Sequence, residues 1–314
     1  MAVEDYPRTI LEFQDRFATE EACRDYLMRL RWPGGFVCPH CGNSEAWPAS
    51  RGRLICKKCR HQASPTAGTI FQDTRRPLRM WFQAIWHVVS EKNGASALSL
   101  QQVLGLGSYA TAWTWMHKLR RAMVRPGRDR LAGRVEVDET YVGGRHPSPI
   151  VGRSLAHKAL VAVAAEEDGS GIGRIRLARI ADRTRPCLHG FIQDVAEPGS
   201  VVHTDGLFAY RGLDDLGYEH QVSVLQGKGS DAAVRLLPRI HIVASLLKRW
   251  LLGTHQGSVS PKHLDYYLDE FTFRFNRRKS ASRGKLFYRL LQQAVEIEPV
   301  PYRSIVGGKQ ERHP

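Results

Sequence analysis

The sequence predicts a multidomain α/β protein, and three observations support this prediction. Two Cys-x-x-Cys pairs lie near the amino terminus, a stretch with helical periodicity follows them, and a longer region then alternates strand-like with helix-like segments. The chain has 314 residues and 42% hydrophobic content, which suffices for more than one core and argues against general disorder. The expected segments are 1–34 (helical), 35–66 (with the cysteine pairs), 75–125 (helical), 133–280 (a mixed sheet) and 281–314 (a helix and tail).

Positive charge is concentrated in two stretches of the chain. Residues 51–130 hold 15 Lys or Arg against three acidic residues, and residues 274–285 hold six basic residues and no acid. For one short run, a solvated face is the simpler explanation. Two runs of this density, with a net charge of +15, favour a polyanion such as DNA or RNA, because each neutralised phosphate releases counterions.

A membrane location is not expected. The longest uncharged apolar stretches fall far short of the roughly 18 residues that a membrane span needs. Acidic residues also stand near the amino terminus, where a secretion signal needs apolar ones. We therefore expect a cytoplasmic protein with no membrane partner.

Four cysteines are spaced as in a zinc ribbon. "CPHC" and "CKKC" have fourteen residues between them, so that two short knuckles can each supply two thiolates to one tetrahedral Zn²⁺. The four ligands would be Cys38, Cys41, Cys56 and Cys59. A closed set of thiolates makes this zinc structural, with glycines at the ribbon's turns, Gly42 and Gly52. The alternatives are unrelated thiols or two disulfides. Cys23 and Cys187 have no such partners and are expected to be semi-buried thiols.

The stretch from Leu78 to Met123 has the periodicity of helices. A first helix stops at "NGAS"; Ser99 is then expected to cap a short helix that ends at Leu104, and a glycine turn at 105–107 leads into a longer helix ending in "KLRR". This order is the helix-turn-helix outline, with a purely structural hairpin as the alternative.

The longer helix is expected to place its polar side in a groove of DNA while Ala112, Met116 and Leu119 pack inward. Its groove-facing residues would be Thr111, Thr114, Trp115 and Lys118. Basic residues that follow on the same helix or lie on the ribbon are further candidates for nucleic-acid contacts. These are Arg120, Arg121, Lys57 and Lys58.

Residues 133–210 predict three strands, a helix and a fourth strand. "GRVEVDETYVGG" alternates like a half-buried strand, "HKALVAVAAEEDG" and "GRIRLARIAD" continue it, residues 185–195 are helical, and "GSVVHTDGLFAY" enters the fourth strand. This order opens a ribonuclease-H-like fold, whose first and fourth strands lie side by side in parallel. Asp138 and Asp205 would then face a common site for Mg²⁺, which prefers carboxylates. A turn-forming role for Asp205 in "DG" is the alternative.

A later helix carries two polar candidates. Pro238 suits its first turn and Gly253 its end, so His241 and Lys248 fall two turns apart on one helix. With Ser245 they form a polar stripe beside an apolar face. That face is Ile240, Val243, Ala244, Leu247 and Leu251.

Together these motifs resemble a bacterial insertion-sequence transposase of the family that combines an N-terminal zinc ribbon with a DDE-type, ribonuclease-H-like catalytic domain. The matching stretches occur in order over roughly residues 20–280. They are "CPHCG", "CKKC", "AGTIF", "VDETYVGG", "HTDG", the His and Lys seven apart, "LLGTHQG" and "YLDEFTFRFNRR".

The resemblance implies that Asp138 and Asp205 are the first two catalytic acids and that His241 stands where the third acid is expected. The family admits Asn or His there, followed by the same lysine, so Lys248 would contact phosphate near the scissile bond. Imidazole suits Mn²⁺ better than Mg²⁺, and His241 could instead bond a phosphate oxygen or move a proton. The reserve carboxylates are Glu136, Glu139, Asp269 and Glu270, the last with a surface salt bridge as its alternative role.

The resemblance also implies the activity. The ribbon and the helical segment would bind the element's terminal inverted repeats, and the catalytic domain would cut the ends and transfer the freed 3′-hydroxyls to target DNA. Arg274, Arg277 and Arg278 would hold DNA, at least a dimer would pair two ends, and the protein would work at the bacterial nucleoid. A catalytically inactive zinc-containing regulator and a metal-dependent nuclease without strand transfer are the two alternatives.

Overall fold

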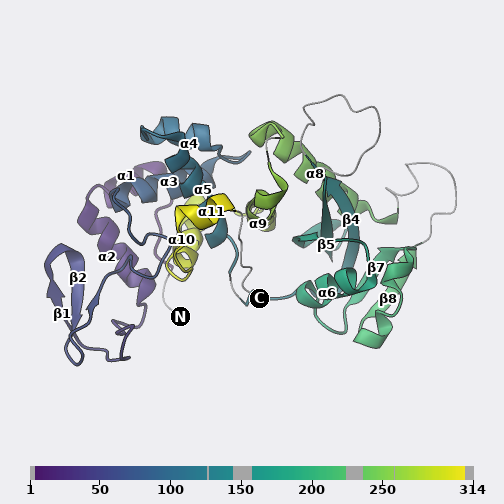
Figure 1. Ribbon diagram of the computed structural model, residues 1–314, viewed down its shortest axis with the longest axis horizontal. Helices are drawn as coiled ribbons and strands as arrows, with labels where there is room; N and C mark the ends of the chain where they lie inside the picture. Colours follow the sequence, from purple (N-terminus) through teal and green to yellow (C-terminus); the bar gives the residue numbers. More distant parts are fainter. Residues whose placement is uncertain (1–3, 126, 144–157, 224–235, 258, 308–314) are drawn as a thin grey trace. The chain divides into compact units, whose positions relative to one another are not determined.

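The computed structural model describes residues 4–125, 127–143, 158–223, 236–257 and 259–307, which form two compact units (Figure 1). The first, which we call the ribbon–helix unit, is built from residues within Met1–Arg125 and Lys279–Gln310. The second, which we call the sheet unit, lies within Pro126–Arg278. The sheet unit is therefore inserted between two parts of the chain that fold together.

A small antiparallel sheet carries the cysteine pairs. Its strands are joined in the order β1-β2-β3, and a short 3-10 turn, η1 (Ser50–Gly52), connects the first two. Gly52 has a left-handed backbone with a φ of +64°, as expected for a glycine at this turn. The strands are β1 (Ala46–Ala49), β2 (Arg53–Cys56) and β3 (Gln62–Ala63).

The helices of the ribbon–helix unit come from both parts of the chain. Phe287, near the carboxyl end, packs among aromatic residues of the first helices, with its ring centroid 5.3 Å from that of Phe13 and 5.6 Å from that of Phe82. The predicted C-terminal helix is thus part of this core. The helices are α1 (Ile10–Arg16), α2 (Glu20–Arg31), α3 (Leu78–Ser90), α4 (Ala97–Leu104), α5 (Tyr109–Ala122), α10 (Arg283–Ala294) and α11 (Tyr302–Gly307).

Helices α4 and α5 form the predicted short-helix, turn, long-helix arrangement. Gly105 ends α4 in the left-handed conformation with a φ of +60°, which glycine adopts without strain. The predicted cap was wrong: Ser96, not Ser99, caps α4, because the Ser96 hydroxyl accepts the backbone N–H of Ser99 at 3.0 Å. Ser99 itself lies in the first helical turn.

The sheet unit contains a five-stranded mixed sheet in the order β6-β5-β4-β7-β8. β4 is antiparallel to β5 and parallel to β7, as predicted for the first and fourth strands of a ribonuclease-H-like domain. The predicted helix is α6 (Arg185–Val195), whereas the last strand, β8, was not predicted. The strands are β4 (Arg134–Val142), β5 (Ala159–Asp168), β6 (Gly171–Ile180), β7 (Val201–Asp205) and β8 (Glu219–Ser223).

Helices cover both faces of this sheet. α6 packs on one face, where Val135 and Val137 of β4 point. α8 (Pro238–His255) and α9 (Leu264–Asn276) pack on the other face against Val163 of β5. Because side chains alternate along a strand, Glu136 and Asp138 face α8 and α9. Short 3-10 turns complete the unit at η2 (Phe208–Tyr210), η3 (Asp214–Leu216) and η4 (Pro261–His263).

No helix in the described part of the chain is long and apolar enough to cross a membrane.

Candidate functional site

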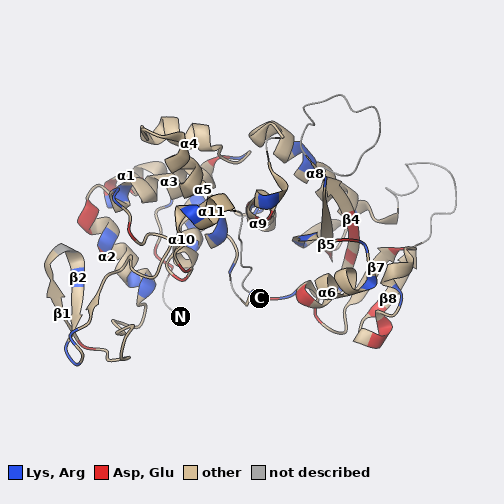
Figure 2. Cartoon of the chain, viewed as in Figure 1, with Lys and Arg blue, Asp and Glu red and all other residues tan. Residues whose placement is uncertain are grey.

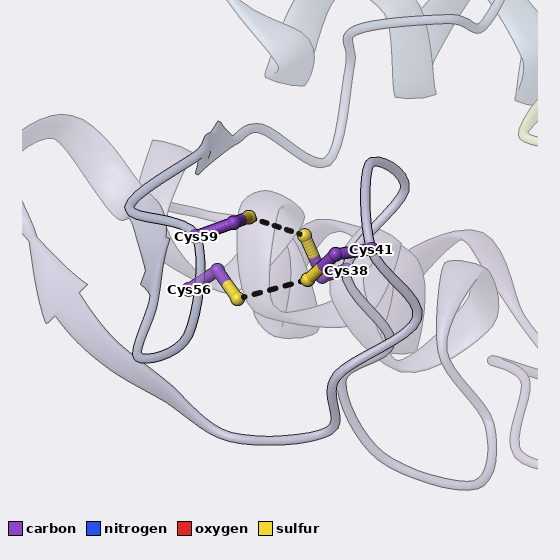
Figure 3. Close-up of side chains that lie close together, drawn as sticks. All are labelled: Cys38, Cys41, Cys56 and Cys59. Carbon is purple, nitrogen blue, oxygen red and sulfur yellow. Dashed lines mark hydrogen bonds between the residues drawn. The ribbon is translucent and has the colours of Figure 1, made fainter.

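The four predicted zinc ligands lie together in the ribbon–helix unit (Figure 3). The Sγ atoms of Cys38 and Cys59 are 3.6 Å apart, as are those of Cys41 and Cys56, and all four lie within 4.8 Å of one another. A tetrahedral Zn²⁺ with Zn–S bonds of about 2.3 Å requires sulfur atoms about 3.8 Å apart. The geometry therefore fits a structural zinc ion.

The two knuckles share one backbone design. The N–H of Gly42 donates to the carbonyl of Cys38 at 2.9 Å, and the N–H of Arg60 donates to that of Cys56 at 3.0 Å. Gly42 and Arg60 both have a left-handed backbone, with φ of +72° and +61°. Hydrogen bonds from the backbone N–H groups of Cys59 and Lys58 lower the pKa of the Cys56 thiol to about 6, which favours the ligating thiolate.

The two cysteines outside the ribbon differ from each other. Cys23 is fully buried rather than semi-buried, and burial raises the pKa of its thiol to about 12. Cys187 is partly buried, as predicted.

Asp138 and Asp205 stand at corresponding places on two adjacent parallel strands. The last paired residues of β4 and β7 are Glu136 and His203, and each aspartate follows its strand's member of that pair by two residues. Both aspartates are partly buried. Asp138 Oδ1 accepts the backbone N–H of Glu139 at 2.7 Å, and Asp205 Oδ1 accepts that of Leu207 at 3.0 Å.

The pKa of Asp138 is far above the ordinary value of an aspartate. Burial raises its pKa to about 7, and the negative charges of Glu139 and Asp205 add to this effect, while the N–H of Glu139 and the Arg183 guanidinium oppose it. Two partly buried carboxylates that repel each other are the donors a hard divalent cation prefers. The donor set therefore fits such an ion.

His241 and Lys248 both lie on α8, as predicted. The predicted apolar face of the helix is buried throughout, whereas His241 is partly buried and Lys248 is exposed. Partial desolvation and the charge of Lys158 lower the pKa of Lys248. Lys248, Lys158 and Tyr141 line a hollow of about 260 Å³.

The three predicted ligands of the catalytic metal ion are not gathered tightly. Only two groups of three or more His, Cys, Asp or Glu in the described residues have ligand atoms within 4.8 Å of one another. One is the cysteine set, and the other is Glu136, Glu167 and His203; Asp138, Asp205 and His241 do not form such a group. Metal ligation by His241 therefore stays a prediction.

The Glu136 group is a charge-balanced network rather than a metal site. Arg239 Nη1 lies 2.9 Å from Glu136 Oε1 and 3.1 Å from Glu167 Oε1, while Arg134 Nε donates to Glu167 at 2.8 Å. Burial, with the nearby Arg134 charge, lowers the pKa of His203 and favours its neutral form. Two carboxylates thus already face two guanidinium groups, which a cation would have to displace.

The other reserve carboxylates have different surroundings. Glu139 accepts the Tyr210 hydroxyl at 2.7 Å and pairs with Arg183. The Glu270 side chain is 0% exposed and pairs with Arg274 at 2.8 Å, so this salt bridge is buried instead of lying on the surface. Asp269 is partly buried.

Two predicted DNA-facing residues of α5 point into the core instead. Trp115 is 5% exposed and stacks on Trp81 with ring centroids 3.8 Å apart, and Arg120 is 2% exposed. Trp115 lies three positions after Ala112, and Arg120 lies four positions after Met116, so both are on the helix side that packs inward and neither is exposed to DNA. These two predictions were wrong.

Three of the remaining α5 candidates line a hollow of about 490 Å³. Thr111, Thr114 and Lys118 share it with Arg75 and Arg76, two exposed residues that sequence reasoning missed. Lys118 Nζ donates to the Ile70 carbonyl at 3.3 Å, and burial lowers its pKa. High local charge was the available signal for both arginines, but no periodicity predicted their place beside α5.

The other basic candidates belong to both units, in each of which Figure 2 shows Lys and Arg residues along the chain in blue. Lys57 and Lys58 are exposed on the ribbon, and Arg121 is partly buried. Arg277 lies over the Phe273 ring at 4.1 Å and Arg278 over the Phe275 ring at 4.0 Å. Arg274, within α9, pairs with Glu270. These three arginines thus make contacts inside the sheet unit, and DNA contact by them stays a prediction.

Comparison with known proteins gives two family matches. The model of the ISXO2-like transposase domain matches residues 130–276, and that of a transposase zinc-ribbon domain matches residues 18–62. Together these matches span more than half of the chain, and they contain both aspartates, His241, Lys248 and all four ribbon cysteines.

Two individual proteins are also similar. An uncharacterized protein in transposable element ISH50 of Halobacterium salinarum is 28% identical over 279 residues, which is 82% of this chain and 91% of that protein. The crystal structure of the Mos1 strand transfer complex matches with 13% identity and a TM-score of 0.27, covering 77% of this chain and 82% of that chain.

Proposed function

Because the chain belongs to the insertion-sequence transposases that join an N-terminal zinc ribbon to a DDE-type catalytic domain, we propose that it binds the terminal inverted repeats of an insertion sequence, cuts the element ends and transfers the freed 3′-hydroxyls to target DNA. One observation carries this proposal. Asp138 and Asp205 stand two residues beyond the last pair of the parallel strands β4 and β7 and repel each other across a partly buried site.

In this proposal Asp138 and Asp205 hold Mg²⁺ or Mn²⁺. A divalent cation bound there would activate the attacking oxygen and stabilise the leaving one. In the first step water attacks the phosphorus at the element end and the bond to the 3′ oxygen breaks. In the second step the freed 3′-hydroxyl attacks a target phosphate and displaces its 3′ oxygen. His241 contacts either the cation or a phosphate oxygen, and the ammonium group of Lys248 pairs with phosphate near the scissile bond.

DNA recognition is assigned to the ribbon–helix unit. The hollow beside α5 brings Arg75, Arg76 and Lys118 close to two threonine hydroxyls, a combination suited to the DNA backbone. The zinc ribbon adds Lys57 and Lys58. Pairing of two element ends would require at least a dimer, acting on double-stranded DNA at the bacterial nucleoid.

A strand-transfer assay tests the proposal. Pre-cleaved inverted-repeat ends are incubated with target plasmid in Mg²⁺ and, separately, in Mn²⁺, and a joined product is expected. Asp138→Asn and Asp205→Asn should abolish joining without weakening DNA binding, whereas Asp194→Asn, an exposed acid on α6, should leave both intact. Cleavage without a joined product would identify a nuclease. DNA binding without metal-dependent cleavage would identify a regulator.

A further inference from the structure

Glu136 connects the strand that carries Asp138 to the helix that carries His241. It is 1% exposed on β4, and its Oε2 accepts the backbone N–H of Arg239 at 2.9 Å and that of Ile240 at 3.0 Å. Its Oε1 accepts Arg239 Nη1 at 2.9 Å. One carboxylate thus binds both the backbone and a side chain in the first turn of α8.

Arg239 extends this connection to the neighbouring strands. Its Nε donates to the Gly171 carbonyl and its Nη2 to the Gly169 carbonyl, both at 2.9 Å. Its Nη1 also lies 3.1 Å from Glu167 of β5. The start of α8 is therefore held against β4, against β5 and against the turn that joins β5 to β6.

We propose that Glu136 is a positioning residue that sets His241 relative to Asp138. Asp138 lies two residues beyond Glu136 on the same face of β4, and His241 directly follows Ile240, so the bonds of Glu136 fix both neighbours at once. The carboxylate is also matched to the positive end of the helix. The inference rests on the proposed function, since that function places His241 and Asp138 in one metal-dependent site.

The chain offers a matched control for removing this carboxylate. Glu166 of β5 is also buried and paired, and it accepts the N–H of Ala132 at 2.9 Å and Arg174 Nε at 2.8 Å. These bonds do not involve α8. Glu136→Gln and Glu166→Gln should therefore both lower the thermal midpoint, because each removes a buried carboxylate that pairs with a guanidinium group.

Only Glu136→Gln should change the metal requirement. Mn²⁺ binding to the complex of full-length protein and inverted-repeat DNA is measured by electron paramagnetic resonance, beside the Mn²⁺ dependence of end cleavage. We expect Glu136→Gln to raise the half-saturating Mn²⁺ concentration by about 10-fold in both measurements, with DNA affinity unchanged. Glu166→Gln should give the wild-type value.

The outcomes separate this inference from the proposed function. Wild-type Mn²⁺ binding by Glu136→Gln would overturn the positioning role, while joining that still depends on Asp138 would leave the function standing. Joining by Asp138→Asn would overturn the function itself. If Glu136→Gln does not fold, Glu136→Asp decides instead, because it keeps the negative charge beside Arg239 while its shorter side chain no longer holds both backbone N–H groups in place. It should shift the Mn²⁺ requirement in the same direction by less, and no shift would contradict the inference.

Discussion

At the scale of single residues, the raised pKa of Asp138 predicts how stability depends on pH. Its ordinary value is 3.8 and its value in the fold is about 7, so the folded protein binds this proton more tightly than the unfolded chain does. Stability from this group is fully present below pH 3.8 and is lost as the pH rises through 7. Asp138→Asn, which mimics the protonated form, should stabilise the metal-free protein at pH 8 by roughly 2 kcal/mol, less than the full shift because the group is partly solvated.

Thermal unfolding at pH 4 and pH 8, without added Mg²⁺ or Mn²⁺, measures this effect. The difference between Asp138→Asn and wild type should vanish near pH 4. An equal difference at both pH values would mean that repulsion and burial of the Asp138 carboxylate are not its source.

The presence of histidine instead of an acidic residue at position 241 predicts how substitutions there affect strand transfer. His241→Ala should lose strand transfer, because no imidazole remains to bind the cation or a phosphate oxygen, and His241→Glu should keep it with better use of Mg²⁺, which prefers carboxylates. Initial rates in each metal give the answer. Full activity of the alanine variant would assign the third role to another residue.

Residue-level prediction from sequence agrees with the structure in placement where the chemistry is local to a strand end or a knuckle. Asp138 and Asp205 lie on adjacent parallel strands and the four ribbon cysteines lie together, while the roles of these residues stay predictions. Glu136 could be noticed only as a reserve carboxylate, because its partner Arg239 lies 103 positions away and nothing in the sequence pairs them. Arg120 was misplaced because charge alone does not reveal that a helix turns that side inward.

At the scale of elements, the zinc ribbon should depend on each of its thiolates. Cys56→Ser removes the ligand whose pKa the knuckle lowers, so the variant should lose its zinc and the order of β1, β2 and β3. Metal analysis gives the zinc content and amide NMR dispersion reports the ribbon. Cys187→Ser, outside the ribbon, is the control and should keep one zinc per chain. Retention of zinc by Cys56→Ser would contradict the four-thiolate site.

The hollow beside α5 predicts the salt dependence of DNA binding. Each phosphate contact contributes about 0.9 to the slope of log affinity against log salt, so changing Arg75 and Arg76 together to Ala should reduce the slope by roughly 2. Fluorescence anisotropy with an inverted-repeat duplex measures it. Arg8→Ala, an exposed arginine elsewhere in the unit, is the control. An unchanged slope in the double variant would exclude the hollow as a DNA contact.

Element-level prediction depended on how strongly each segment is patterned. The helix predicted at 185–195 has the bounds of α6, in which apolar positions repeat and Pro186 stands in the first turn. β8 was missed because "EHQVS" is short and polar and is held by its pairing with β7. The pairing of β8 with β7 depends on the tertiary structure, so the intrinsic strand propensity of the five residues does not predict it.

At the scale of the whole molecule, the ribbon–helix unit contains both the first and the last described parts of the chain, and the sheet unit lies between them in sequence. Linear segmentation of the sequence predicted a separate C-terminal helix and tail, whereas α10 belongs to the core of the ribbon–helix unit. Periodicity shows that a helix has an apolar face but does not show which face it meets. The sheet unit therefore keeps both of its own hydrophobic layers, one on each face of its sheet.

This arrangement predicts that Phe287 stabilises a core whose aromatic members on the first helices lie some 200 or more residues earlier in the chain. Phe287 is fully buried among Phe13, Phe17 and Phe82, so Phe287→Ala should destabilise the ribbon–helix unit by about 3–5 kcal/mol. Differential scanning calorimetry should show a lowered transition for that unit and an unchanged one for the sheet unit, because each has its own core. Phe208→Ala is the control, since this side chain is 64% exposed and should cost little. An equal effect of both substitutions would show that α10 is not part of the core.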